Sequence, residues 1–405
     1  MKPEESEASN SMITHLHVSN FKSLKTLDIR LRPLNVLSGP NMSGKSNILD
    51  VFRFLYELIF PQAGGVQGLS YALAQRGGVN EVLWKGGDDK LISIALNGVD
   101  DSDPTSQSQF EYKIELLTGI GDFVTIQTES LVVERGGTRT DLINREKGFA
   151  YLKNLDGSIV GNAAGGDSSA LQYPQPNWDG FRMHQWIKSW RFYHLIPPAM
   201  RQPSLMSLGQ VLQPSGENLS AWLMWLQAHS VQSFIRVNEV LRDIFPDVIE
   251  VKTIPTPDGR VHLATSEKGL KRPTFVWQTS DGFLVLTALL SLIYVPPVLS
   301  GTLFCIEEPE NHLHPRILET LVALLRQVRR EVLDAHGILT QLFITTQSPY
   351  LLDQFSIDDI IWVQKREGAT EASRPSDQSH LKKLVEDKEL GLGGLMYSGV
   401  LGEGK

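Results

Sequence analysis

A glycine-rich stretch between a short apolar strand and an apolar helix constrains this chain more than any other feature. It reads Leu34-Asn35-Val36-Leu37-Ser38 and then Gly39-Pro40-Asn41-Met42-Ser43-Gly44-Lys45-Ser46-Asn47, with helical apolar spacing from 48 to 60. Glycines let consecutive backbone N–H groups turn inward, and the following helix directs its positive N-terminal end at the same point. The order of strand, loop and helix therefore predicts that residues 39–47 form a phosphate-binding loop.

Two residues of this loop have specific expected roles. Lys45 would reach the outer phosphates of the ligand, and the Ser46 hydroxyl would hold a magnesium ion. The alternative is a glycine-rich turn that binds nothing. The strand before the motif and the helix after it favour the phosphate-binding loop.

Composition and charge indicate a globular chain. Of the 405 residues, 41% are hydrophobic and 21% are charged, which predicts two domains or one domain with a large insertion. A net charge of −8 argues against a protein that coats nucleic acid by bulk electrostatics, although it leaves a local basic groove open.

The single cysteine, Cys305, lies in an apolar run, so we expect a buried thiol and a cytoplasmic location. No apolar run approaches the roughly 18 residues that span a bilayer, so no membrane is expected, and residues 1–11 are expected to be a disordered lead.

Hydrophobic periodicity predicts an α/β chain with antiparallel strands early and helices later. Strands are predicted around residues 13–18, 27–31, 90–96, 110–117, 123–134, 302–306, 342–346 and 360–365, and a hairpin over 248–264. Helices are predicted over residues 48–60, 218–228, 231–244, 283–293, 350–355 and 381–390. Residues 136–180 are rich in Gly, Asn, Asp and Pro, and are expected to be mostly loop. Trp178, Trp186 and Trp190 fall on apolar periodicity, which favours a core over a base-stacking platform.

A second group of candidate site residues ends an apolar strand, in Thr302-Leu303-Phe304-Cys305-Ile306-Glu307-Glu308-Pro309-Glu310. Next to a phosphate-binding loop, Glu307 would lie beside the metal ion and Glu308 would act as the general base that orients water. An acidic strand end that is merely solvated is the alternative. The strand is apolar up to the acids, which favours the functional interpretation.

Two helix starts flank this strand. Ser280-Asp281-Gly282 precedes one helix, with Ser280 as N-cap; simple capping would explain it, and so would an anion site at an exposed helix N-terminus. Downstream, Thr345-Thr346-Gln347 ends another apolar strand, and Ser348-Pro349 begins a helix.

In this order, the motifs resemble the ABC-type ATPases of the RecF/SMC branch, and within it the stand-alone AAA family ATPases related to the OLD proteins. Asn20-Phe21-Lys22-Ser23-Leu24 and Asn311-His312-Leu313-His314-Pro315 also fit that group. The resemblance covers about residues 12–60 and 275–400. It is recognisable only in patches between them, such as Pro197-Pro198-Ala199-Met200-Arg201.

The resemblance implies an α/β P-loop NTPase fold, an ABC ATPase head with a mixed sheet, an antiparallel β subdomain and a helical insertion. It divides the chain into an N-lobe over 12–135, an insertion over 136–272 and a C-lobe over 273–405. It also implies ATP hydrolysis with Mg2+ in a head-to-head homodimer, where each ATP is sandwiched between the phosphate-binding loop of one chain and the signature of the other.

The resemblance assigns further roles residue by residue. The signature is Ser280, Asp281 and Gly282, and the D-loop that communicates across the dimer is Asn311, His312, Leu313 and His314. Glu307 assists the magnesium, Glu308 activates water and Gln347 contacts the γ-phosphate. Gln75 is the candidate for the glutamine that senses the metal.

Two positions depart from the family pattern. The strand-end residue that is usually Asp is Glu307, one methylene longer, and the switch residue that is usually His is Gln347. Gln347 can donate a hydrogen bond but cannot carry a proton as an imidazolium, so we expect slow turnover. A zinc site at His312 and His314 is disfavoured, because no Cys or second His pair completes a ligand set.

Missing parts narrow the expected function. The long interval between the phosphate-binding loop and the signature argues against a transporter ATPase, and the absence of heptads excludes an SMC coiled coil. Few residues follow Gln347, so a fused nuclease domain is not expected. We therefore expect a sensor or regulator for a separate effector, a nuclease or toxin, in anti-phage defence. The alternatives are an ATP-gated scaffold with little hydrolysis and a RecF-like DNA-repair ATPase that binds DNA.

Overall fold

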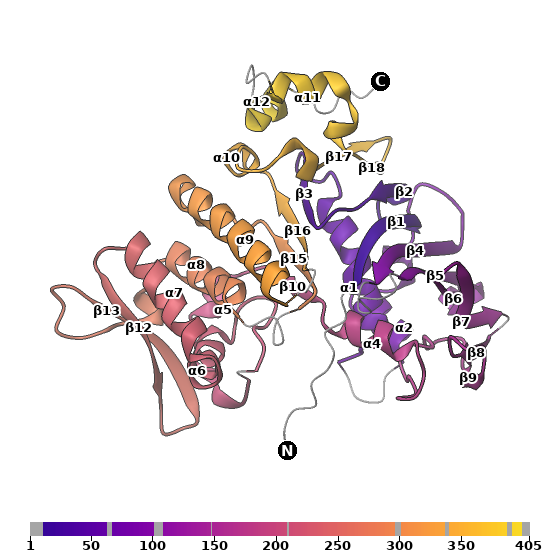
Figure 1. Cartoon of the computed structure of the whole chain (residues 1–405), viewed down its shortest axis with the longest axis horizontal. Helices are drawn as coiled ribbons and strands as arrows, with labels where there is room; N and C mark the ends of the chain where they lie inside the picture. The colour runs from indigo at the N-terminus through magenta and orange to yellow at the C-terminus, as the bar shows by residue number, and fades with distance from the viewer. Residues whose placement is uncertain are drawn as a thin grey trace.

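The computed structural model describes residues 11–62, 67–100, 108–146, 148–208, 210–295, 301–336, 340–386 and 391–398. Within these ranges the chain folds into a large antiparallel sheet, a mixed central sheet, and a group of helices with a small third sheet (Figure 1). The predicted α/β class is confirmed. The disordered lead predicted for residues 1–11 lies outside the described residues, except for Ser11, which begins the first strand.

The antiparallel sheet occupies one side of the molecule (Figure 1). Its order is β2-β1-β4-β5-β6-β7-β8-β9. The bounds are β1 (Ser11–Phe21), β2 (Leu24–Arg30), β4 (Leu91–Asp100), β5 (Ser108–Thr118), β6 (Val124–Arg135), β7 (Thr138–Glu146), β8 (Phe149–Lys153) and β9 (Ile159–Ala164).

The central sheet carries the phosphate-binding loop at one strand end. Its order is β10-β15-β16-β3-β17-β18, parallel throughout except for the last pair. The bounds are β3 (Leu34–Ser38), β10 (Arg191–Tyr193), β15 (Leu303–Glu307), β16 (Gln341–Thr346), β17 (Ile360–Arg366) and β18 (Ala369–Ser373). Alternate side chains enter opposite cores: Cys305 and Phe343 belong to one hydrophobic cluster, and Phe304 and Ile344 to the other.

Helices cover both faces of this sheet. The bounds are α1 (Lys45–Ile59), α2 (Gly68–Ala74), α3 (Val79–Val82), α4 (Phe181–Lys188), α5 (Pro197–Met200), α6 (Leu219–His229), α7 (Val231–Ile244), α8 (Asp281–Ile293), α9 (Pro315–His336), α10 (Pro349–Leu352), α11 (Ser379–Glu386) and α12 (Leu392–Ser398). Helix α1 packs in the core shared with the antiparallel sheet, and α8 packs in the other core. Within the described ranges, no helix is both long and apolar enough to cross a membrane.

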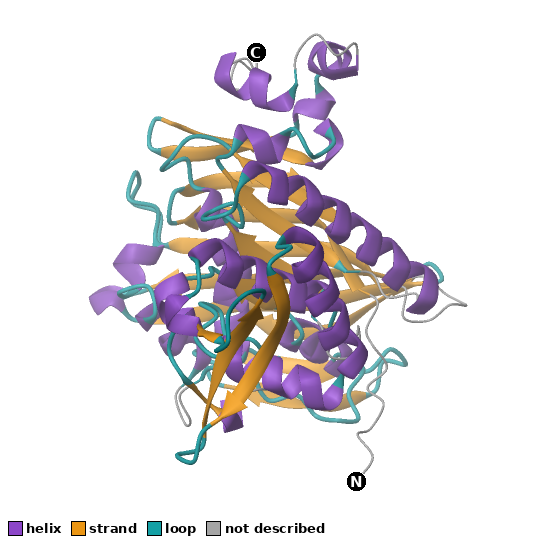
Figure 2. Ribbon diagram, turned by 90° about the vertical axis from the view of Figure 1, so that its left-hand side faces the viewer, coloured by secondary structure: helices purple, strands orange, loops and turns teal. Residues whose placement is uncertain are grey.

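A small sheet projects from the helical side. It contains β11 (Ser204–Leu205), β12 (Val248–Pro255), β13 (Arg260–Glu267) and β14 (Thr274–Phe275), and its long β12–β13 hairpin stands in front of the helices in Figure 2. The hairpin predicted over residues 248–264 is confirmed.

The prediction that residues 136–180 are mostly loop is wrong. Residues 138–164 form β7, β8 and β9, which extend the antiparallel sheet. Alternation is weak there because the strands form the outer end of the sheet and expose Phe149, Tyr151 and Ile159. Strand β10 also lies within the predicted 136–272 insertion, yet it belongs to the central sheet. The tryptophan prediction is confirmed, because Trp178, Trp186 and Trp190 are buried.

Candidate active site

The phosphate-binding loop joins β3 to α1 in an unusual backbone conformation. Gly44 precedes α1 with a φ of 103°, and Met42 has a φ of 62°. Positive φ is easily reached by glycine and is uncommon elsewhere. The turn presents the N-terminus of the 15-residue helix α1, whose dipole favours an anion.

A C-terminal hairpin formed by β17 and β18 supports the loop from behind. A Cβ on Gly39 would lie 1.8 Å from the carbonyl oxygen of Val363, and one on Gly44 would lie 2.0 Å from Thr370 Oγ1. Thr370 Oγ1 donates to the carbonyl oxygen of Ser43 (2.8 Å). Both glycines are therefore needed for close packing as well as for backbone geometry.

Side chains from the N-terminal strands complete this support. Ser23 lies between β1 and β2, and its Oγ is 2.6 Å from Thr370 Oγ1 and accepts from Asn47 Nδ2 at 2.6 Å. Hydrogen bonds from Asn47 to Ser23 and from Ser23 to Thr370 thus connect α1 to the turn between β1 and β2 and to β18. Sequence patterns placed Ser23 and Asn47 in motifs but gave no signal for Thr370.

Lys45 is buried within the loop. Its Nζ donates to the carbonyl oxygens of Gly39 (2.8 Å) and Pro40 (2.9 Å). Burial lowers the pKa of Lys45, whereas the nearby carboxylates of Glu308 and Glu310 act in the opposite direction. The ammonium group is therefore held in the loop, within electrostatic range of Glu308 and Glu310, which follow β15.

Strand β15 brings Glu307 to Ser46, so the two predicted metal ligands are in contact. Ser46 Oγ donates to Glu307 Oε2 at 2.7 Å. A hydroxyl and a carboxylate are ligands that Mg2+ accepts, so these two side chains fit a magnesium ion. No group of three or more His, Cys, Asp or Glu side chains in the described ranges could hold a metal, so a cation here would need phosphate oxygens or water as well.

Glu308 is oriented by two side-chain amides. Gln347 Nε2 and Asn311 Nδ2 (2.9 Å) both donate to its carboxylate. The backbone of Glu308 has a φ of 46°, a left-handed conformation that non-glycine residues adopt mainly where surrounding contacts impose it. Strand β16 provides those contacts, because Glu308 N donates to the carbonyl oxygen of Thr345 at 3.0 Å.

Glu310 links the same two strand ends. Its Oε1 accepts from Thr346 Oγ1 (2.6 Å) and from the Gln347 backbone N–H (3.0 Å). Burial raises the pKa of the Glu310 carboxyl, and Glu308 adds to this effect, while these hydrogen bonds oppose it. Sequence reasoning placed Glu310 in the motif without a role; here it fixes Gln347.

The signature and the D-loop meet each other in the same chain. Ser280 caps α8 by accepting from Phe283 N (3.3 Å). Asp281 pairs with Arg201 at 2.5 Å and with His312 Nδ1 at 3.3 Å, and a Cβ on Gly282 would lie 2.5 Å from the His312 carbonyl oxygen. These contacts, among the described residues, join the signature to the D-loop and not to the phosphate-binding loop.

A cavity of about 180 Å³ opens beside Ser46 and Glu307. Its lining includes Lys22, Asp50, Arg53 and His194. Gln75 lies instead in an adjoining cavity of about 490 Å³, which shares Lys22, Asp50 and Arg53 with the first. Gln75 is therefore placed one cavity away from the candidate metal ligands, and its role as a metal sensor stays a prediction.

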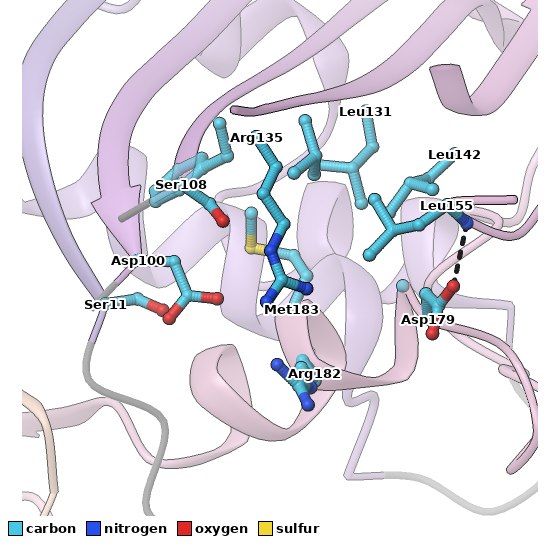
Figure 3. A pocket seen from close by; sticks show the side chains of 13 residues that line it. Ser11, Asp100, Ser108, Leu131, Arg135, Leu142, Leu155, Asp179, Arg182 and Met183 are labelled. Atoms are coloured by element: carbon cyan, nitrogen blue, oxygen red, sulfur yellow. Dashed lines mark hydrogen bonds between the residues drawn. The ribbon is translucent and has the colours of Figure 1, made fainter. Parts of the chain in front are cut away.

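A third cavity, of about 140 Å³, lies between the antiparallel sheet and α4. Figure 3 shows Arg135 and Arg182 near Asp100, with Leu131, Leu142 and Leu155 to one side. The Leu155 N–H donates to Asp179 at its edge (2.7 Å). No predicted site residue lines this cavity.

Two segments of the chain match known protein families. Residues 12–114 match the family described as "AAA ATPase domain", and residues 217–353 match the family described as "AAA domain, putative AbiEii toxin, Type IV TA system". No curated protein sequence matches the chain.

Solved structures show the same fold. The chain is similar to an SMC head bound to the C-winged helix domain of ScpA, with a TM-score of 0.52 and 14% identity over 89% of this chain and 97% of that one. It is also similar to an Smc head domain with an extended coiled coil, bound to the C-terminal domain of ScpA derived from Pyrococcus furiosus. That match has a TM-score of 0.52 and 14% identity over 93% and 100% of the two chains. The chain is therefore an ATPase whose α/β fold is similar to that of SMC heads.

Proposed function

We propose that the chain hydrolyses ATP as a head-to-head homodimer and that its nucleotide state regulates a separate effector protein. The observation that carries the proposal is the hydrogen bond between Ser46 and Glu307. Glu307 is the last residue of β15, and Glu308 follows it directly. Loop, candidate metal ligands and candidate base thus meet at one sheet edge, as ATP hydrolysis requires.

Each side chain has a role in this reaction. Lys45 leaves the carbonyl oxygens of Gly39 and Pro40 to contact the outer phosphates, and Ser46 and Glu307 hold magnesium. When bound, Mg2+ neutralises charge that develops on the phosphates. Glu308 accepts a proton from water, and Gln347 orients either Glu308 or the γ-phosphate through its amide.

Partner regulation rests on the comparisons. Both SMC heads named above are bound to ScpA domains, and one matched family carries the description of a toxin in a type IV toxin–antitoxin system. We propose by analogy that this chain contacts an effector of the nuclease or toxin class in anti-phage defence. A relationship to the OLD proteins belongs to the same proposal.

Phosphate release and particle size test the proposal together. Lys45→Ala should abolish turnover, and Glu308→Gln should lower kcat by about 10² or more while trapping an ATP-bound dimer. Glu319→Gln, an exposed acid on α9, is the matched control and should behave as wild type. Unchanged turnover in Lys45→Ala would show that the assignment is wrong.

An ATP-gated scaffold is the second candidate, and the contacts of Glu308 favour it. Two amides already donate to this carboxylate, so water must compete with Asn311 and Gln347 for its oxygens. The scaffold predicts ATP-dependent dimers of the wild type without measurable phosphate release.

A further inference from the structure

His194 reaches the metal side of the site through the topology of the central sheet. Strand β10 pairs in parallel with β15, in a register that sets Phe192 beside Cys305 and Tyr193 beside Ile306. His194 directly follows β10, and Glu307 is the last residue of β15, so the two residues come next after the Tyr193–Ile306 pair. Because carboxyl ends of parallel strands meet at one edge, these two residues lie at the same edge of the sheet.

The backbone after β10 is held in place by a loop from the helical side. His194 N donates to the carbonyl oxygen of Pro214 (2.9 Å), and Ile196 N donates to that of Ser215 (3.0 Å). His194 is therefore presented by a strand end with two fixed hydrogen bonds, not by an unsupported loop.

The cavity at this edge places His194 with the candidate metal ligands. Its lining contains Ser46, Glu307 and His194. The cationic side chains that share it are matched by acids on α1: Lys22 pairs with Asp50 at 2.5 Å, and Arg53 with Glu57 at 3.7 Å. Asp50 and Glu57 thus compensate the positive charges of Lys22 and Arg53, so these side chains do not prevent a cation from binding in the cavity.

We infer that His194 supplies a nitrogen ligand to the divalent cation that accompanies ATP, an inference that rests on the proposed ATPase site. Hydroxyl, carboxylate and phosphate oxygens suit Mg2+, whereas an imidazole nitrogen is a softer donor that first-row transition-metal ions, Mn2+ included, bind more strongly than Mg2+ does. A mixed set of Ser46, Glu307 and His194 therefore binds Mn2+ more tightly than Mg2+. Gln75, in the adjoining cavity, is not needed for this ligand set.

The direct test is pulsed electron paramagnetic resonance of Mn2+ with ATP bound to the full chain. Echo modulation from a directly coordinated 14N should appear in the wild type and disappear in His194→Gln and His194→Ala. His380→Gln, an exposed histidine on α11, is the matched control and should retain it. Nitrogen modulation from the adenine ring of ATP would persist in every variant. Nitrogen modulation that survives in His194→Gln would therefore overturn the inference.

Metal titration gives a second readout that does not depend on turnover. The affinity for Mn2+ in the presence of ATP should fall at least about tenfold in His194→Ala, the lower end of what loss of even an outer ligand contact costs. The affinity for Mg2+ should fall less. In His194→Gln, the ratio of the Mn2+ affinity to the Mg2+ affinity should be smaller than in wild type. Equal losses for both metals would overturn the inference.

Different results would contradict the ATPase proposal and the inference about His194. If wild type binds Mn2+ with ATP but shows no nitrogen modulation, His194 is not a ligand and the ATPase proposal is untouched. If wild type binds no metal–ATP complex, the ATPase proposal fails and the inference about His194 fails with it.

Discussion

Two neutral amides donate to the carboxylate of Glu308, the proposed general base. Gln347 approaches Glu308 from β16 and Asn311 approaches it from the D-loop, so the carboxylate is held by neutral donors on two elements. A histidine at position 347 could exchange a proton with a phosphate or water, and an amide cannot. In the proposed mechanism, Gln347 therefore orients Glu308 without transferring a proton.

Replacing Gln347 by Leu tests this orienting role. The variant leaves Glu308 with Asn311 as its remaining side-chain donor, so we expect kcat to fall by about tenfold, the loss of roughly 1.4 kcal/mol of transition-state stabilisation. KM for ATP should stay close to wild type, because the phosphate-binding loop is intact. Steady-state phosphate release measures both values. A raised KM with unchanged kcat would assign Gln347 to nucleotide binding instead.

Sequence spacing reveals the site residues that lie in short motifs, because strand, turn and helix bring near neighbours together in a fixed way. Ser46 and Glu307 were predicted by this route and Gln347 by the family resemblance, and the structure brings all three to one edge of the sheet. Thr370 and His194 were missed, because their positions follow from strand pairing between distant segments. Thr370 and Ser43, for example, are 327 residues apart.

At the scale of elements, the β17–β18 hairpin acts as a rigid backing for the phosphate-binding loop. Thr370 is 1% exposed and pairs with Lys365 across the hairpin, so its hydroxyl is fixed against the loop. The loop needs this backing, since Gly39 and Gly44 leave it with little conformational restriction of its own.

Thr370→Val removes the hydroxyl with little change in volume. The Ser43 carbonyl and the Ser23 hydroxyl then lose a buried partner, which costs about 1–3 kcal/mol. We expect ATP affinity to fall about tenfold, with a circular dichroism spectrum like that of wild type. Equilibrium binding of a fluorescent ATP analogue measures the change, and Thr138→Val, exposed on β7, is the control. Wild-type affinity in Thr370→Val would show that the loop holds its shape alone.

Helix α1 is anchored at its middle by a charged network. Asp50 pairs with Arg76 (2.6 Å) and Lys22 (2.5 Å), and Arg76 also pairs with Glu57 (2.6 Å). Burial would raise the pKa of Asp50, but Arg76 and Lys22 outweigh it and hold the pKa below its ordinary value of 3.8. Asp50 thus contributes stability above its unfolded pKa and loses it as pH falls through the lower folded value.

Asp50→Asn should therefore destabilise the chain in a pH-dependent way. At pH 7 the free energy of unfolding should fall by about 3 kcal/mol, because Arg76 is left with an incomplete set of partners. The deficit relative to wild type should be constant at neutral pH and shrink as pH falls below 3.8 toward the lower folded pKa. Urea denaturation from about pH 2.5 to pH 8 measures it, with the exposed Asp243→Asn as control. A deficit that grows on acidification would contradict the assigned pKa direction.

Long, strongly periodic elements were predictable from the sequence. Helix α7 and strands β4 to β6 fall where periodicity placed them. Strands β7 to β9 were missed, because their outer residues face solvent and their stability comes from pairing with β6, a tertiary effect that no local pattern carries. Strand β10 has only 3 residues and is defined by its neighbour β15.

On the scale of the whole molecule, the central sheet separates the two halves of the proposed nucleotide site. Residues of α1 pack in the core on one face of the sheet, and residues of α8 pack in the core on the other (Figure 1). The signature contacts Arg201 and the D-loop, as described above. A nucleotide held by both the phosphate-binding loop and a signature is thus best explained by a second chain, as closed twofold dimers provide.

Mixing two inactive variants tests this composite site. Lys45→Ala removes the phosphate contact of one chain, and Gly282→Asp crowds the His312 carbonyl and puts a carboxylate at the signature. Each variant alone should be inactive. In a heterodimer, one site combines both defects and the other combines an intact loop with an intact signature. With random pairing and independent sites, an equal mixture should recover about a quarter of wild-type phosphate release.

The control for this recovery pairs Lys45→Ala with Ser46→Ala. Both defects lie in the phosphate-binding loop, so every site in the mixed dimer retains one of them and no activity should return. Light scattering establishes that each mixture dimerises with ATP. A mixture of Lys45→Ala and Gly282→Asp that forms dimers yet stays inactive would refute independent composite sites. Full activity in Gly282→Asp alone would place catalysis within a single chain.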